Sequence, residues 1–189
     1  MENKLLAEFY RKNKITSGSY GMPEEIMRKY AHALPEEIVE LWRTGGRRTY
    51  VDDFFWVVNP DDYKDSLDTI YAESGDSIVV ARDAFGDLFI WEGGSLQFVN
   101  IRHGYAEVVG MDMKVFFNKL ATHWESFSKK LKADQYPEAR EKLGRLHPDE
   151  CYGYVPILAA GGPEKIENLR KVKVKEHLSI IAQTTGQIK

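Results

Sequence analysis

Two groups of side chains in this sequence have the types and spacing that could do chemistry. The first is His147, Asp149 and Glu150, which places one imidazole beside two carboxylates. Such a set could bind a metal ion or exchange a proton with a substrate. A solvated turn whose acids cap the next element has the same composition, and we favour that simpler interpretation.

The second group is an acidic stretch from Val51 to Asp76. It has one basic residue, Lys64, against eight acidic ones, in a chain of net charge −3: Asp52, Asp53, Asp61, Asp62, Asp65, Asp68, Glu73 and Asp76. The C-terminal residues 164–189 have the opposite balance, with six bases and three acids. The stretch is either a solvated face or a surface that complements a basic protein, since charge complementarity favours association.

Motifs of known enzyme classes are absent from the sequence. It has no phosphate-binding loop, dinucleotide fingerprint, nucleophile elbow or zinc-protease helix. Cys151 is the only cysteine, which excludes an intramolecular disulfide and a thiolate zinc cluster, and we expect it to pack as a small hydrophobe. The histidines lack the spacing of helix-borne metal ligands. We therefore expect no catalytic residue, no metal site and no cofactor.

The composition is that of an ordinary folded protein. Of 189 residues, 43% are hydrophobic and 29% are charged. The chain has neither an apolar signal segment nor a stretch long enough to span a membrane, so we expect a soluble cytoplasmic protein with no membrane contact. The negative net charge disfavours direct binding to nucleic acid.

The N-terminal part predicts helices that flank short strands. Pro23 and Pro35, each followed by two glutamates, mark helix starts. The residues from Phe54 to Val58 predict a buried strand. Asn59 begins a predicted helix that continues to about Tyr71, and Asp61 and Asp62 interact favourably with the positive end of its dipole. Four further strands separated by glycine-bearing turns predict an antiparallel meander: Ser77–Arg82, Asp87–Trp91, Leu96–Arg102 and Tyr105–Val109.

The C-terminal part predicts one long helix and then shorter elements. Asp112 caps a helix that continues to Leu131 and carries one apolar stripe: Met113, Phe117, Leu120, Trp124, Phe127 and Leu131. A short helix (136–143), an extended edge or loop (152–160), a strand (169–174) and a last helix (176–182) follow. We expect an α+β fold in which a small antiparallel sheet packs against helices. A compositional boundary near Gly110 divides residues 1–110 from 111–189, which we expect to form one globular unit with its four tryptophans in the core.

Several strings of this sequence resemble a known bacterial family. SYGMPEEIMRKY, LPEEIVELW, WVVNPDDY and ARDAFGDLFIW are similar to the "GAD-like" N-terminal part of a family of immunity proteins. KLGRLHPDECYGYVPIL and GGPEKIENLRKVKVKEHLSIIAQTTG are similar to its C-terminal segment. The order of elements also resembles the SUKH (SMI1/KNR4-like) immunity fold. The resemblance implies a protein that neutralises a DNase toxin delivered by type VI secretion.

The leading hypothesis is therefore a non-enzymatic immunity protein of a toxin–antitoxin pair, bound to a cognate nuclease toxin with a basic DNA-binding surface. The partner-binding residues that we expect are Asp52, Asp53, Asp65, Asp68, Glu73, Asp76, His147, Asp149 and Glu150. One alternative is a small metal- or ligand-binding enzyme or sensor that uses His147, Asp149 and Glu150. Another is an adaptor of the same secretion system.

Overall fold

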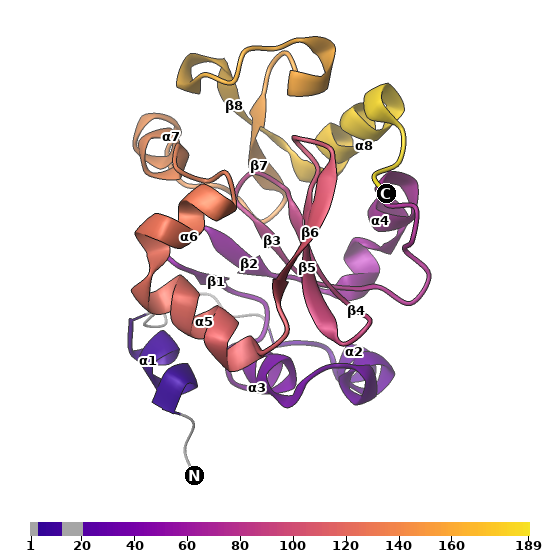
Figure 1. Ribbon diagram of the computed structural model, residues 1–189, viewed down its shortest axis with the longest axis vertical. Helices are drawn as coiled ribbons and strands as arrows, with labels where there is room; N and C mark the ends of the chain where they lie inside the picture. The colour runs from indigo at the N-terminus through magenta and orange to yellow at the C-terminus, as the bar shows by residue number, and fades with distance from the viewer. Residues whose placement is uncertain (1–3, 13–20) are drawn as a thin grey trace.

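A six-stranded antiparallel sheet forms the centre of the molecule (Figure 1). The computed structural model describes residues 4–12 and 21–189. The strands follow each other in chain order across the sheet: β1 (Thr49–Tyr50), β2 (Phe55–Val57), β3 (Ile78–Asp83), β4 (Leu88–Glu92), β5 (Ser95–Asn100) and β6 (Tyr105–Gly110). This confirms the α+β class and the meander. β1 was not predicted from the sequence, because two residues are too short to show an alternating pattern.

Glycines make the tight turns of the meander possible. Gly93 and Gly94 join β4 to β5 with φ angles of 55° and 77°. Two successive positive φ angles are what a two-residue hairpin turn needs, and glycine adopts them without steric cost.

The helices of the described residues, other than α1 and α6, begin close to where the sequence predicted them. They are α1 (Lys4–Lys12), α2 (Glu24–Tyr30), α3 (Glu36–Gly45), α4 (Lys64–Ile70), α5 (Met113–Thr122), α6 (Trp124–Lys130), α7 (Tyr136–Leu143) and α8 (Val174–Thr185). Pro23 and Pro35 immediately precede α2 and α3. The predicted helix after Asn59 is divided into a 3₁₀ turn, η2 (Pro60–Asp62), and α4.

Helices cover both faces of the sheet, as Figure 1 shows for α5 on one side and for α4 and α8 on the other. Strand residues alternate between the two faces. Along β4, Phe89 joins an apolar cluster with Trp42 and Phe116, whereas Leu88 and Ile90 join a second cluster. Residues of α4 and α8, among them Leu67 and Leu178, complete that second cluster.

The predicted helix from Asp112 to Leu131 is not continuous, which corrects the sequence analysis. It breaks at His123 (φ −126°, ψ 33°) into α5 and α6. The hydroxyl of Thr122 donates to the carbonyl of Asn118 at 2.7 Å and contacts the His123 ring at 2.7 Å. Such local bonds compete with regular helix geometry. The apolar stripe is nevertheless buried, except for Trp124, which is half-buried against the Phe54 ring.

Of the four tryptophans expected in the core, one is fully buried and the other three pack against the core while partly exposed. Trp42 is 1% exposed, but Trp56, Trp91 and Trp124 are each half-buried. Trp56 belongs to a strand near one edge of the sheet, where no helix covers it completely. Its position there makes it part of a cleft.

The C-terminal part adds a two-stranded antiparallel sheet of β7 (Glu150–Tyr154) and β8 (Leu169–Lys173). Pro156 lies beyond the end of β7, as expected of a residue that cannot donate to a strand ladder. The amide of Tyr152 donates to the carbonyl of Ala84 at 2.8 Å, which joins this sheet to the end of β3. The first apolar cluster contains residues from both sides of Gly110.

Candidate functional site

A cleft of about 990 Å³ lies where β1, β2 and β3 meet the C-terminal part. Its floor consists of side chains from three neighbouring strands. Thr49 pairs with Trp56, and Trp56 pairs with Arg82 on its other side. Because directly paired residues share one face of a sheet, the three side chains lie in a row.

Arg82 is the unusual member of this floor. It has no exposed surface, and its guanidinium carbon lies 4.4 Å from the centre of the Trp56 ring. Nη1 donates to the carbonyl of Asp83 and Nη2 to the carbonyl of Pro148, each at 2.9 Å. Nε has no hydrogen-bond partner. No carboxylate of the described residues forms an ion pair with this buried cation.

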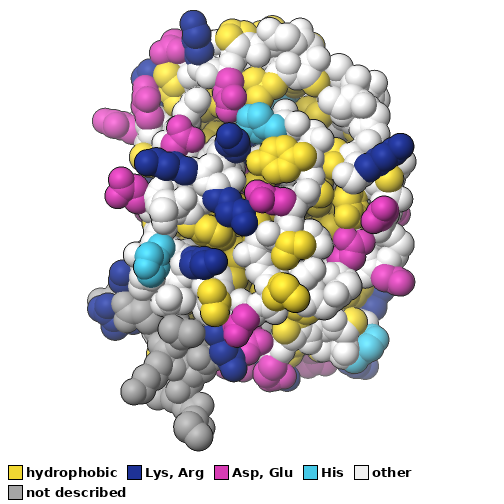
Figure 2. Space-filling view, viewed as in Figure 1, with side chains coloured by type: hydrophobic (Ala, Val, Ile, Leu, Met, Phe, Trp, Pro, Cys, Tyr) yellow, Lys and Arg dark blue, Asp and Glu magenta, His cyan; other side chains and the backbone are white. Residues whose placement is uncertain are grey.

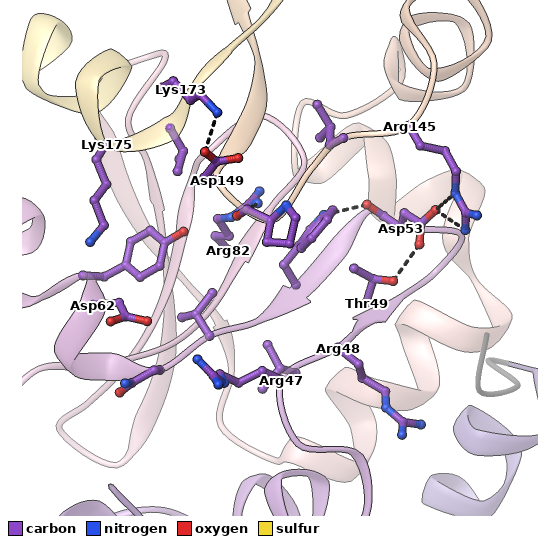
Figure 3. A pocket seen from close by; sticks show the side chains of 18 of the residues that line it. Arg47, Arg48, Thr49, Asp53, Asp62, Arg82, Arg145, Asp149, Lys173 and Lys175 are labelled. Carbon is purple, nitrogen blue, oxygen red and sulfur yellow. Dashed lines mark hydrogen bonds and ion pairs between the residues drawn. The ribbon is translucent and has the colours of Figure 1, made fainter. Parts of the chain in front are cut away.

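Charged residues of several elements surround this floor (Figure 3). The lining contains six basic residues, Arg47, Arg48, Arg82, Arg145, Lys173 and Lys175, and four acidic ones, Asp53, Asp62, Asp149 and Glu176. Arg47 and Arg48 precede β1, Asp62 precedes α4, and Lys175 belongs to the first turn of α8. The cleft therefore carries an excess of positive charge in a chain whose net charge is −3.

Two of the predicted partner-binding residues, Asp52 and Asp53, lie in the turn between β1 and β2 and form ion pairs. Asp52 pairs with Arg140 at 2.8 Å; Asp53 pairs with Arg140 at 3.0 Å and with Arg145 at 2.8 Å. Burial disfavours the Asp53 carboxylate, but hydrogen bonds from Thr49, Arg140 and Arg145 outweigh burial and lower its pKa. These bonds connect the turn to α7 and the residues after it.

The same turn has an unusual backbone. Val51, Asp52 and Asp53 have φ angles of 54°, 56° and 70°. Residues other than glycine, and β-branched ones above all, rarely adopt this left-handed region. The ion pairs to Arg140 and Arg145, with the bond from the Tyr136 hydroxyl to the Asp52 carbonyl, stabilise it.

The other predicted carboxylates of the acidic stretch lie on α4 and the turn that follows it. Asp65, Asp68, Glu73 and Asp76 are exposed. Asp68 forms an ion pair with Lys64 at 3.3 Å. The carboxylates of the other three form no ion pair within the described part of the chain. Figure 2 shows acidic side chains at the edge of the molecule where Figure 1 places α4.

The structure places His147, Asp149 and Glu150 at the start of β7 but does not bring them together as a site. Asp149 forms an ion pair with Lys173, and the hydrogen bond from that ammonium lowers its pKa. The carboxylate of Glu150 accepts from the backbone amide of His147 at 2.8 Å. Only Asp149 of the three lines the cleft. Within residues 4–12 and 21–189, no group of three or more His, Cys, Asp or Glu residues could hold a metal ion.

A buried charged cluster at the turn after β3 was missed by the sequence analysis. Arg102 Nε donates to Asp87 at 2.7 Å, and the Asp83 carboxylate lies 3.9 Å from another Arg102 nitrogen. Burial raises the pKa of Asp83, and the negative charge of Asp87 raises it further. The signal in the sequence was charged residues inside otherwise apolar strands, a pattern that is unfavourable unless the charges are paired.

Cys151 lies close to this buried cluster at the base of β7. The residue has no exposed surface, and burial raises the pKa of its thiol to about 12. Its neighbours are apolar residues of the second cluster. The side chain packs as a small hydrophobe, as expected from the sequence.

Two family models match this chain and together account for most of it. The model described as "GAD-like domain" matches residues 4–104, more than half of the chain. The model described as "T6SS immunity protein Tdi1, C-terminal" matches residues 111–185. The cleft contains residues from both matched regions.

Among solved structures, the crystal structure of Atu4351 from Agrobacterium tumefaciens is similar to this chain. The TM-score is 0.78 at 19% sequence identity, over 96% of this chain and 88% of that one. At this identity the likeness concerns the fold alone. No curated protein matches the chain. No helix of the described residues is long and apolar enough to cross a membrane.

Proposed function

This chain belongs to the family of type VI secretion immunity proteins that join a GAD-like domain to a Tdi1-type C-terminal region, and from that premise we propose that it binds and neutralises a cognate DNase toxin. It acts by association and not by catalysis, in the cytoplasm of the cell that produces it. The observation that carries this proposal is the pair of family matches over residues 4–104 and 111–185.

The charge distribution supports a basic partner. A DNase needs a cationic surface to hold phosphates. Asp65, Glu73 and Asp76 present exposed carboxylates that no ion pair within the described residues occupies. Such charges accelerate encounter with a basic surface. Asp52, Asp53 and Asp149 contribute less, because each is already paired within the chain.

The first test is protection from the toxin. The protein is co-produced with a candidate DNase-type effector, chosen from the genes that neighbour its own, and cell survival and chromosomal DNA integrity are measured. We expect survival and intact DNA only when the protein is present. Continued DNA cleavage by the purified effector in the presence of excess protein would contradict the proposal.

The second test concerns the acidic surface. Asp65→Lys/Asp76→Lys should slow association with the effector at low salt about tenfold, since steering by charge accelerates association by roughly 10- to 1,000-fold. Stopped-flow binding at two salt concentrations measures this. The matched control is Glu125→Lys/Glu141→Lys, which makes the same charge change at two exposed sites outside the acidic stretch. Equal association rates for both double variants would place the interface elsewhere on the protein.

A further inference from the structure

We propose that the cleft between the edge of the sheet and the C-terminal part is a binding site for a small phosphate ester, such as a nucleotide or a sugar phosphate. Asp65, Glu73 and Asp76, the exposed carboxylates proposed for the toxin, do not line this cleft. Its cations come from three separate elements: Arg47 before β1, Arg82 in β3 and Lys175 in α8.

The buried Arg82 side chain is the first observation that points to an anion. A buried charge is ordinarily balanced by an opposite charge. Arg82 has no exposed surface, and the groups that it contacts are uncharged: two carbonyl oxygens, the face of Trp56 and the Tyr63 hydroxyl. Its Nε–H group also lacks an acceptor. A phosphate in the cleft would supply the opposite charge, because guanidinium groups attract phosphate oxygens strongly.

Mixed charge in the lining indicates the size of the ligand. The four carboxylates of the lining would repel a long polyanion such as nucleic acid or an acidic peptide. A small ligand with one anionic end avoids them, and its hydroxyl groups can donate to carboxylates such as Asp62. The volume, about 990 Å³, lies within the range of roughly 300–1,000 Å³ that is usual for small-molecule sites.

Aromatic side chains lie beside the cations of the cleft. Trp56 and Tyr63 both line the cleft, and Trp56 remains half-buried although Arg82 covers one face of its ring. Lys175 Nζ lies 5.9 Å from the centre of the Tyr63 ring. A half-exposed ring next to cations suits a ligand that joins a flat or apolar group to a phosphate.

Isothermal titration of the purified full-length chain at low ionic strength tests the proposal. The probes are ADP, ribose 5-phosphate, inorganic pyrophosphate, adenosine and a pentaglutamate peptide. We expect saturable binding of ADP or ribose 5-phosphate and none of adenosine or the peptide. Tighter binding of ADP identifies a nucleotide site, and equal or tighter binding of ribose 5-phosphate identifies a sugar-phosphate site.

Two variants and a matched control connect the binding to this cleft. Lys175→Gln should raise the Kd of the tighter-binding probe, ADP or ribose 5-phosphate, about tenfold, as expected for the loss of one hydrogen bond to a charged group. Arg82→Lys keeps the charge but loses the forked donor, and should weaken binding at least as much. Lys165→Gln removes an exposed lysine outside the cleft and should change nothing.

Three results would overturn the proposal. They are the absence of saturable binding by every phosphate compound, a Kd that Lys175→Gln leaves unchanged, and binding of the pentaglutamate peptide without binding of phosphates. The last result would assign the cleft to an acidic protein segment. Because the titration contains no toxin, its failure leaves the proposed immunity function intact.

Discussion

At the scale of single residues, Arg82 and Asp83 show how strand alternation separates neighbours. Successive side chains of a strand face opposite sides of the sheet. Arg82 therefore lies in the cleft against Trp56, whereas Asp83 lies beside Arg102 and Asp87 in the interior. Arg82 has no charged partner among the described residues, so it is suited to binding a ligand. Asp83 has two charged neighbours, so it is suited to stabilising the turn after β3.

A pH experiment can separate the roles of Asp83 and Asp87. Burial and the charge of Asp87 raise the pKa of Asp83 to about 8. Its carboxyl group is then neutral in the folded protein at pH 5, but charged in the unfolded chain, whose pKa is about 3.9. Protonated Asp83 therefore contributes stability that is fully present below about pH 3.9 and is lost progressively as the pH rises to about 8.

We therefore expect Asp83→Asn, which cannot titrate, to become more stable relative to the native protein between pH 5 and pH 8.5. Asp87→Asn should cost about 3–5 kcal/mol across this range, since it leaves Arg102 buried without its closest carboxylate. Urea unfolding at each pH measures both effects. An unchanged relative stability of Asp83→Asn across this range would show that Asp83 is charged in the folded state, because its carboxyl group would then be ionised in both states.

At the scale of elements, α5 and α6 owe their positions to aromatic contacts. Phe116 of α5 is 1% exposed and contacts the rings of Phe55, Phe89, Phe117 and Phe127. Trp124 begins α6 directly after the break at His123 and is only half-buried. The break lets both helices bury apolar residues that one straight helix would direct differently.

Substitutions on these two helices should differ in cost. We expect Phe116→Ala to lower the free energy of unfolding by about 3–5 kcal/mol, because it removes a fully buried aromatic ring and leaves a cavity. Trp124→Ala should cost about 1–2 kcal/mol, since part of its surface is already in water. Denaturant unfolding of both variants measures this. A larger loss for Trp124→Ala than for Phe116→Ala would mean that the packing of α6 is more important than its exposure suggests.

At the scale of the whole molecule, residues on both sides of Gly110 share one apolar cluster. Phe89 and Trp42 from the GAD-like region pack in it with Phe116 and Leu169 from the Tdi1-like region. The ion pairs of Asp52 and Asp53 with Arg140 also cross this boundary. We propose that residues 1–110 and 111–189 fold as one cooperative unit.

Unfolding experiments test this proposal. The full chain should show one transition in urea, with the same midpoint by far-UV circular dichroism and by tryptophan fluorescence. A fragment of residues 1–110 should lack a cooperative transition, because it exposes the sheet face that α5 covers. Arg140→Gln should lower the urea concentration at the midpoint, and unfolding should still occur in a single transition. Two separate transitions in the full chain would show that the regions fold independently.

The sequence by itself determined the local structure of this protein and its family. Alternating apolar strands, glycine turns and proline-led helix starts depend on residues close together in the chain, and they predicted the meander and most helices. The break at His123 was missed because a periodic stripe continues across it. Long strings also identified the immunity family, since family likeness is a property of sequence.

Only the tertiary structure decided which charges are available for function. Asp52 and Asp53 appear in the sequence as free members of an acidic stretch, but Arg140 and Arg145, 87 to 92 residues away, pair with them. The cleft likewise joins Arg47, Arg82 and Lys175, which no local pattern connects. The physical reason is that electrostatic interactions depend on distance in space, and a folded chain brings together residues whose separation in sequence carries no information about that distance.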